Sequence, residues 1–93
     1  MNVEFTWSPR KRIANLHAHS LDFVDAAQVF EGFAYTYEDD RLRHGEHRFV
    51  TLGLLADLPV SIVHTERDHE IRILSFRRAT LREAQLYFGE IAN

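Results

Sequence analysis

Three arginines lie close together in a segment that alternates like a β-strand. The segment Ile71–Arg78 contains Arg72 in its interior and ends with Arg77 and Arg78, directly before a helix signal. A guanidinium grips phosphate through two parallel hydrogen bonds and keeps its charge at neutral pH. An anion at the end of this segment would also meet the free N–H groups of a helix N-terminus. The pattern favours a phosphate site, although Arg72 could instead pair with a carboxylate such as Glu46 to stabilise the fold.

A carboxylate and a histidine are candidates for the proton transfer that accompanies phosphate chemistry. Glu46 and Arg48 lie two residues apart in a strand-like segment, so their side chains share one face of the predicted sheet. Glu46 could accept a proton there, or the two residues could form an ordinary surface ion pair. The chain has 6 histidines. Among them, His19 and His64 are acid–base candidates because an ordinary imidazole titrates near neutral pH, with a solvated or capping role as the alternative.

The distribution of charge is uneven behind a formal net charge of −3. Residues 1–20 carry a net +2 and residues 67–82 a net +3, whereas residues 21–58 carry a net −5. Of the 11 basic residues, all but Lys11 are arginine. This bias suits a phosphate-binding surface. The alternative is a GC-rich genome that encodes arginine in place of lysine, with the arginines solvated on the surface. The acidic segment 21–58 argues against a domain that binds nucleic acid broadly and without catalysis.

Several motifs of metal-dependent and covalent catalysis are absent from the sequence. The chain has no cysteine, so it has no disulfide, no thiolate metal site and no cysteine nucleophile. It also has no glycine-rich phosphate loop, no GxSxG and no HExxH zinc spacing. We therefore expect no metal and no cofactor. Proton transfer with electrostatic stabilisation by arginine suits cleavage of an RNA backbone by its own 2′-hydroxyl.

Length and composition predict one globular domain over residues 1–93. The chain is 45% hydrophobic and 27% charged, which is ordinary for a single small core. No apolar run approaches the ~20 residues needed to span a bilayer. The N-terminus lacks the basic and apolar regions of a secretory signal. We therefore expect a cytoplasmic protein that does not bind membranes.

Hydrophobic periodicity predicts an α+β fold in the order β-α-α-β-β-β-β-α. Ser8-Pro9 is a helix start, and Thr80 with Glu83 forms a capping box for the last helix. Short polar turns between strands indicate an antiparallel sheet, with the helices packed on one face as a two-layer sandwich. The expected elements are strands over 2–7, 33–37, 47–57, 60–65 and 70–77, and helices over 9–19, 23–31 and 81–91, with 38–44 as a charged loop.

Alternation within the strands predicts which side chains share a face. In the first helix, Ile13 and Leu16 are expected to point inward. One long strand is expected to place Phe49, Thr51 and Gly53 opposite Val50, Leu52 and Leu54. The last strand is expected to place Ile71, Ile73 and Ser75 opposite Arg72, Leu74 and Phe76.

Several blocks of the sequence resemble the BrnT toxins of type II toxin–antitoxin systems. The last block is the most specific, and together the blocks cover nearly the whole chain in order. They are Phe5–Pro9 with Arg12, Asn15-Leu16, His19 and 23–30; Gly45–Gly53; His64–Arg67; and Ile71–Thr80 followed by Glu83 and Tyr87.

The resemblance implies a RelE-like fold and a ribonuclease that cuts RNA without a metal and halts translation. It implies a BrnA-like ribbon-helix-helix antitoxin as partner in a toxin–antitoxin hetero-oligomer, with DNA bound only through that antitoxin. It also implies a set of RNA-handling residues. These are Glu46, Arg72, Arg77 and His19 as catalytic residues, and Arg48, Arg67 and Arg78 as RNA-binding residues.

One departure from the family pattern leaves a second function open. The family usually has Lys-His-Gly where this chain has Ala18-His19-Ser20. The missing lysine removes a cation that could hold phosphate or transfer a proton, unless His17 or His19 takes its place. The alternative to an active toxin is therefore a weakened or inactive toxin scaffold that only binds its antitoxin.

Overall fold

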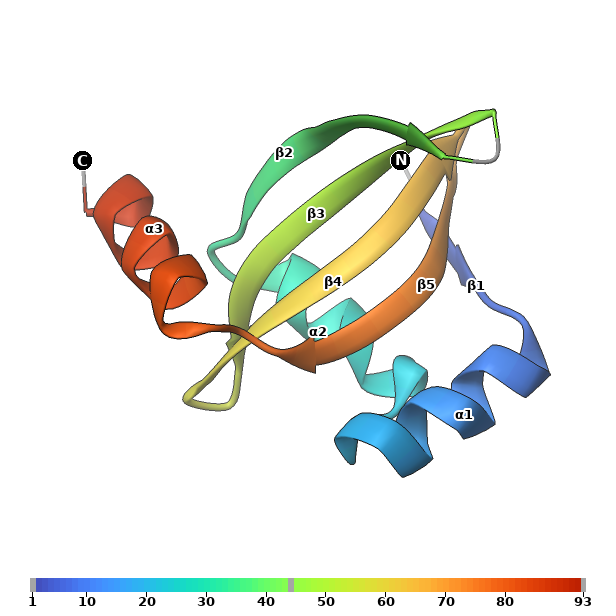
Figure 1. The fold of residues 1–93 in the computed structure, drawn as a ribbon, viewed down its shortest axis with the longest axis horizontal. Helices are drawn as coiled ribbons and strands as arrows, with labels where there is room; N and C mark the ends of the chain where they lie inside the picture. Colours follow the sequence, from blue (N-terminus) through green and yellow to red (C-terminus); the bar gives the residue numbers. More distant parts are fainter. Residues whose placement is uncertain (1, 44, 93) are drawn as a thin grey trace.

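The computed structural model describes residues 2–43 and 45–92, and its elements follow the predicted order (Figure 1). A short 3₁₀ turn, η1 (Phe23–Asp25), precedes the second helix. The charged segment expected as a loop is mostly strand, so the second strand is longer than predicted; His44 lies outside the described residues. The other elements are β1 (Glu4–Thr6), α1 (Pro9–His19), α2 (Ala26–Glu31), β2 (Tyr35–Arg43), β3 (Glu46–Leu55), β4 (Leu58–Arg67), β5 (Glu70–Arg78) and α3 (Leu81–Ile91).

The described strands form a five-stranded sheet in the order β1-β5-β4-β3-β2. Strands β2 to β5 are antiparallel neighbours, as predicted. The prediction of a wholly antiparallel sheet is wrong at one edge, because β1 runs parallel to β5. Two parallel neighbouring strands need a long connection in the sequence. Here all the elements from α1 to β4 form the connection between β1 and β5.

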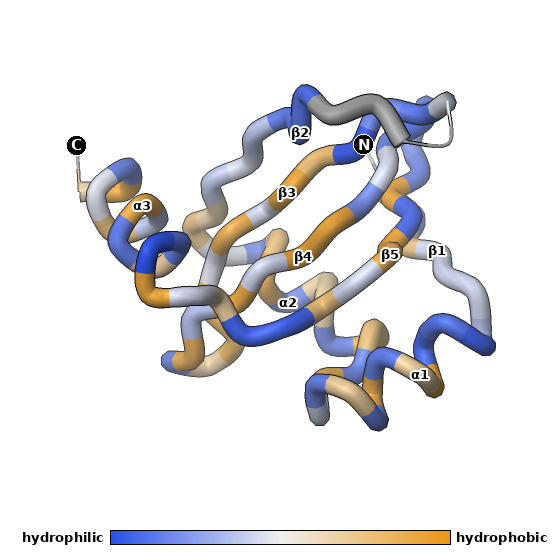
Figure 2. The backbone as a smooth tube through the Cα atoms, in the orientation of Figure 1, coloured by the Kyte–Doolittle hydropathy of each residue, from blue (hydrophilic) through white to orange (hydrophobic). Residues whose placement is uncertain are grey.

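The helices cover both faces of the sheet, so the prediction that they pack on one face is wrong. Helix α2 and turn η1 lie on one face, which we call the α2 face, over a core that includes Phe23, Val29 and Ile62. On the opposite face, which we call the α3 face, Tyr87 of α3 packs with the buried side chains of Val50 and Leu52. Hydrophobic residues occupy the middle of β3 and β4, because these strands are buried on both sides there (Figure 2).

The predicted faces of β3 are confirmed by this packing. Val50 and Leu52 face α3, whereas Thr51 and Gly53 face α2. Helix α2 lies so close that a Cβ atom on Gly53 would come within 2.6 Å of the Val29 side chain. A glycine at this position therefore sets how closely the helix approaches the sheet.

The predicted faces of β5 are correct before Leu74 and wrong after it, because the strand contains a β-bulge. Ser75 pairs with Val63, but the next β4 residue, His64, pairs with Ile73, so Leu74 is an extra residue. A bulge reverses the alternation beyond it. Phe76 therefore joins Ile73 in the core on the α2 face, and Ser75 lies on the α3 face. The sequence alternation alone predicted the opposite.

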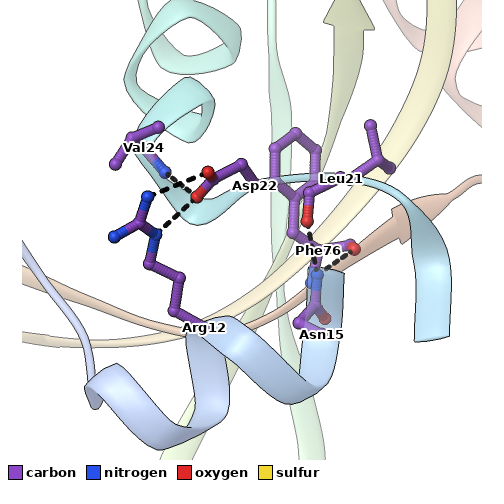
Figure 3. A network of polar contacts seen from close by, with 6 residues as sticks. All are labelled: Arg12, Asn15, Leu21, Asp22, Val24 and Phe76. Carbon is purple, nitrogen blue, oxygen red and sulfur yellow. Dashed lines mark hydrogen bonds and ion pairs between the residues drawn. The ribbon is translucent and has the colours of Figure 1, made fainter. Parts of the chain in front are cut away.

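After the bulge, β5 pairs with β4 on one side, but no described strand pairs with its other edge. Asn15 of α1 binds that edge instead (Figure 3). The Asn15 side-chain amide donates to the Phe76 carbonyl at 2.8 Å and accepts from the Phe76 N–H at 3.0 Å. It also donates to the Leu21 carbonyl at 3.0 Å. One buried amide thus replaces a neighbouring strand and satisfies backbone groups that would otherwise be unpaired.

Asn15 is the buried residue of α1, whereas Ile13 and Leu16 are 60% and 43% exposed, so their predicted inward orientation is wrong. The helix start is as predicted, with the Ser8 side chain accepting from the Lys11 N–H. Hydrogen bonds to β5 orient the helix, and no apolar stripe does so. Hydrophobic periodicity in the sequence reveals only an apolar stripe, so it could not predict this orientation.

We predict that Asn15→Ala lowers the free energy of unfolding by about 3 kcal/mol, because it leaves buried backbone groups of Phe76 and Leu21 unpaired. Urea denaturation followed by circular dichroism measures this change. His17→Ala, on the exposed side of the same helix, is the matched control and should change stability by less than about 0.5 kcal/mol. Equal stability of the two variants would contradict a structural role for the Asn15 amide.

Candidate functional site

Helix α3 leaves one end of its face of the sheet uncovered (Figure 1). A row of polar side chains crosses the face at that end. Arg72 projects from this face because its neighbours Ile71 and Ile73 pack toward α2. Its partner on β4 is Thr65. Arg48 comes next in the ladder, because Phe49 pairs with His64. The full row is Thr6, Arg72, Thr65, Arg48 and Asp39.

A second row lies beside the first, toward the same end of the sheet. Arg67 pairs with Glu70 and follows Thr65 by two residues, so both face the same side. Glu46 precedes Arg48 by two residues and also shares this face. We call this surface the open half of the α3 face. Its members are Thr6, Asp39, Glu46, Arg48, Thr65, Arg67, Glu70 and Arg72.

Three guanidiniums of the open half make no hydrogen bond or ion pair with any described residue: those of Arg48, Arg67 and Arg72. The folding alternative, an ion pair between Arg72 and Glu46, is absent among the described contacts. The Nε atom of Arg48 is buried without a partner. A buried donor with no acceptor costs about 1–3 kcal/mol, and an anion bound to the same guanidinium would offset part of that cost.

Arg77 shares the α3 face with Arg72, but it lies under α3 and is already paired. Its guanidinium donates to both carboxylate oxygens of Glu83, at 2.8 and 3.0 Å. Its partner on β4 is Ser61, four residues from Thr65, the partner of Arg72. That separation is roughly 14 Å at the usual rise of a strand. For Arg77 to bind phosphate beside Arg72, the ion pair would have to open.

Glu83 connects this ion pair to the start of α3. Its side chain accepts from the Thr80 N–H while the Thr80 hydroxyl accepts from the Glu83 N–H, so the predicted capping box is present. Burial alone would raise the pKa of Glu83, but hydrogen bonds from Arg77 and Thr80 outweigh it and leave the pKa below its ordinary value. The pair is therefore charged at neutral pH and fixes α3 on the sheet.

Two further predicted residues lie away from the open half. Arg78 pairs with Val60, whose side chain is buried in the core on the α2 face, so Arg78 is directed to that side and is exposed. His19 is exposed in the last turn of α1, the helix bound to the free edge of β5. The structure therefore brings together Glu46, Arg48, Arg67 and Arg72, but places Arg78 and His19 elsewhere.

The comparison with known families agrees with the resemblance in the sequence. The family model for the ribonuclease toxin BrnT of type II toxin–antitoxin systems matches residues 7–83. The chain belongs to the BrnT toxin family. The match includes all four strands from β2 to β5 and the charged residues of the open half. No individually curated protein matches the chain.

His64 of this BrnT chain, a candidate acid–base group in the sequence, is fully buried on the α2 face. Its Nε2 atom lies 2.7 Å from the Thr51 hydroxyl, which lies 2.7 Å from the Thr36 hydroxyl. The ring packs between Phe30 and Phe49. Burial lowers the pKa of His64 to about 4, so the ring is neutral at physiological pH and inaccessible to RNA.

Several residues of the open half and of the Arg77 ion pair were not predicted from the sequence. Thr6 and Thr65 flank Arg72 only because of the strand order, which no local signal reveals. Glu83 was recognised as a helix cap but not as the partner of Arg77; its position six residues after Arg77, at the start of a helix, was an available signal.

The described residues contain no cluster of three or more His, Cys, Asp or Glu side chains arranged to hold a metal ion. Every described helix is too short or too polar to cross a bilayer. The open half itself offers guanidiniums, threonine hydroxyls and the carboxylates of Asp39, Glu46 and Glu70. The Thr6 hydroxyl donates to the Glu70 carboxylate at 2.6 Å.

We predict that stability falls as the pH drops from about 6.5 to about 4, by up to about 3 kcal/mol from His64 alone. In this window the unfolded chain binds a proton at His64 and the folded chain does not, so acid favours unfolding. Urea denaturation across this range, compared with His64→Gln, isolates the contribution, and NMR titration of the ring measures the pKa directly. A His64 pKa near 6.5 in the folded protein would contradict the assignment.

Proposed function

We propose that this chain is a metal-independent endoribonuclease whose cutting of RNA inhibits translation. The observation that carries the proposal is the group of guanidiniums of Arg48, Arg67 and Arg72 beside Glu46 on the open half, which have no partner among the residues that the structure describes. Family membership supports ribonuclease activity, and the RelE-like arrangement of the fold belongs to the same proposal.

In this proposal, Arg72 and Arg48 hold one phosphate between them. Thr65 separates them in the row, so their Cα atoms are roughly 10 Å apart at the usual spacing of strands. Arginine side chains span such a gap from both sides. Their fixed charges would stabilise the extra negative charge that develops on the phosphate in the transition state.

The proposed step is attack of the RNA 2′-oxygen on the adjacent phosphorus. The bond between the 2′-oxygen and phosphorus forms, the bond to the 5′-oxygen breaks, and the products are a 2′,3′-cyclic phosphate and a 5′-hydroxyl. Glu46 takes the proton of the 2′-hydroxyl, and a protonated group or water returns one to the 5′-oxygen. His19 is the alternative base, and its place on α1 would require RNA to reach past the edge of β5.

The other arginines have proposed roles that follow their positions. Arg67 holds a flanking phosphate in the row beside Arg72. Arg78, on the other side of the sheet at the end of β5, holds a phosphate of RNA that continues past that end. Arg77 remains a predicted catalytic residue only in a state where Glu83 releases it. In the paired state it is a positioning residue that fixes α3.

We further propose that the chain acts in the cytoplasm in a hetero-oligomer with a BrnA-like ribbon-helix-helix antitoxin, and that DNA is bound only through that antitoxin. Type II toxin–antitoxin membership supports an antitoxin partner.

The second candidate is a weakened or inactive toxin scaffold that only binds its antitoxin. The pairing of Arg77 with Glu83 favours it, as does Ala18 in place of the family lysine. Ala18 lines a hollow of about 290 Å³ beside Lys11 and Leu74. Lys11 is thus a cation close to the position that the lysine would occupy.

We predict that Arg72→Ala slows cleavage of a defined RNA by about 100-fold, because it removes one charge that stabilises the transition state. Arg10→Ala, an exposed arginine of α1, is the matched control and should retain the original rate. Gel analysis of labelled RNA measures both rates, and circular dichroism confirms folding. If the unaltered chain leaves RNA intact while still binding its antitoxin, the scaffold function replaces the nuclease.

We predict that excess EDTA does not change the cleavage rate, because guanidiniums and Glu46 carry the step. Mass spectrometry of the products should show a 2′,3′-cyclic phosphate on the upstream fragment. Loss of cleavage in EDTA and its recovery with Mg²⁺ would contradict the mechanism and indicate a metal-assisted attack by water.

A further inference from the structure

An apolar hollow lies on the α2 face, on the opposite side of the sheet from the open half. It has a volume of about 530 Å³, which is within the range of small-molecule and side-chain binding sites. Its walls come from β1, the start of β5 and helix α2. Its lining residues are Asn2, Val3, Phe5, Ala27, Phe30, Glu31 and Ile71.

The walls of the hollow are mostly aromatic and aliphatic. The rings of Phe5 and Phe30 lie 5.3 Å apart and, with Ile71, pack against the core. Val3 at the rim is 48% exposed, and Ala27 leaves space on the helix side. Apolar side chains of a partner would bury this surface and gain its transfer free energy.

The rim of the hollow is acidic. Glu31 lines it directly. Glu66 lies close by, because it pairs with Ile71 and its carboxylate is 3.5 Å from His64, whose ring packs on Phe30. None of the described lining residues is basic, and the segment 21–40, which includes α2, has no lysine, arginine or histidine.

We propose that this hollow docks a segment of the antitoxin that carries apolar anchors flanked by arginine or lysine. The inference rests on the proposed function, which supplies an antitoxin as the partner. An antitoxin that binds DNA carries basic residues. The acidic rim of the hollow attracts such a segment, whereas the arginines of the open half repel it. Helix-in-groove docking of this kind is a common mode of recognition.

Docking here separates the two functions of the molecule. The hollow is on the α2 face, whereas Glu46, Arg48, Arg67 and Arg72 are on the α3 face. A substitution in the hollow therefore leaves these cleavage residues in place. The antitoxin would anchor in the hollow and inhibit with another part of its chain. This separation makes the docking site testable without disturbing the nuclease.

The test measures the affinity of the full chain for the purified antitoxin encoded beside its gene, by isothermal titration calorimetry. Glu31→Arg reverses the charge at the rim, and Ala27→Trp fills the hollow. We expect each variant to bind at least tenfold more weakly than the unaltered chain. Glu90→Arg, the same charge reversal on exposed helix α3, is the matched control and should bind within twofold. All three should cleave RNA at the original rate.

Each result decides between the proposals. Affinity within twofold for either Glu31→Arg or Ala27→Trp would overturn the docking site while leaving the nuclease intact. A chain that dimerises by itself, and becomes monomeric in Ala27→Trp, would show that a second copy fills the hollow and overturn the antitoxin as its occupant. Failure of the unaltered chain to bind any neighbouring gene product would overturn both the partner and its site, whereas absence of RNA cleavage bears only on the nuclease.

Discussion

The bulge at Leu74 is the constraint on which the arrangement of charged residues depends. Strict alternation through β5 would place Arg72 and Arg77 on opposite faces of the sheet. The extra residue places both on the α3 face and directs Arg78 to the other. Asn15 binds the backbone of Phe76 just after the bulge, so the helix that covers the edge of β5 also holds the strand in its irregular register. A bulge is a common device for re-aiming a side chain beside a functional site.

Covering the sheet on both faces divides the molecule into regions of different character. Helix α3 occupies one half of its face and is held there by the ion pair between Arg77 and Glu83. The other half retains three arginines that have no partner in the described part of the chain. On the far side, α2 contributes an acidic rim to an apolar hollow. The net charge of −3 is therefore a poor guide to ligand binding. The electrostatic potential that a ligand meets depends on which face of the protein it approaches.

The sequence predicted the features that local chemistry determines. The caps at Ser8 and Thr80 were predicted correctly because they depend on a few adjacent residues, and so were the two faces of β3. The side of the sheet taken by α3 was not, because the residues that bury it come from β2, β3 and β4. The burial of Asn15 was not predicted either, since its partners are backbone groups distant in sequence.

The candidate site was predictable to the same limited extent. Glu46 and Arg48 share a face by spacing alone, and this was correctly inferred. Their proximity to Arg72 depends on strand order, and the pairing of Arg77 depends on where α3 begins; neither follows from periodicity. Family membership supplies the ribonuclease activity, while the geometry indicates which arginines remain free to serve it.

The most direct measurement is NMR of the arginine Nε–H groups during titration with a short RNA that is 2′-O-methylated at every position and therefore cannot be cleaved. We predict that the signals of Arg48 and Arg72 shift with bound RNA. The signal of Arg12, which is held by Asp22 on the far side of the β5 edge, should stay in place. Shifts confined to residues of α1 and α2, with Arg48 and Arg72 unmoved, would show that RNA binds elsewhere and would contradict the proposed RNA site.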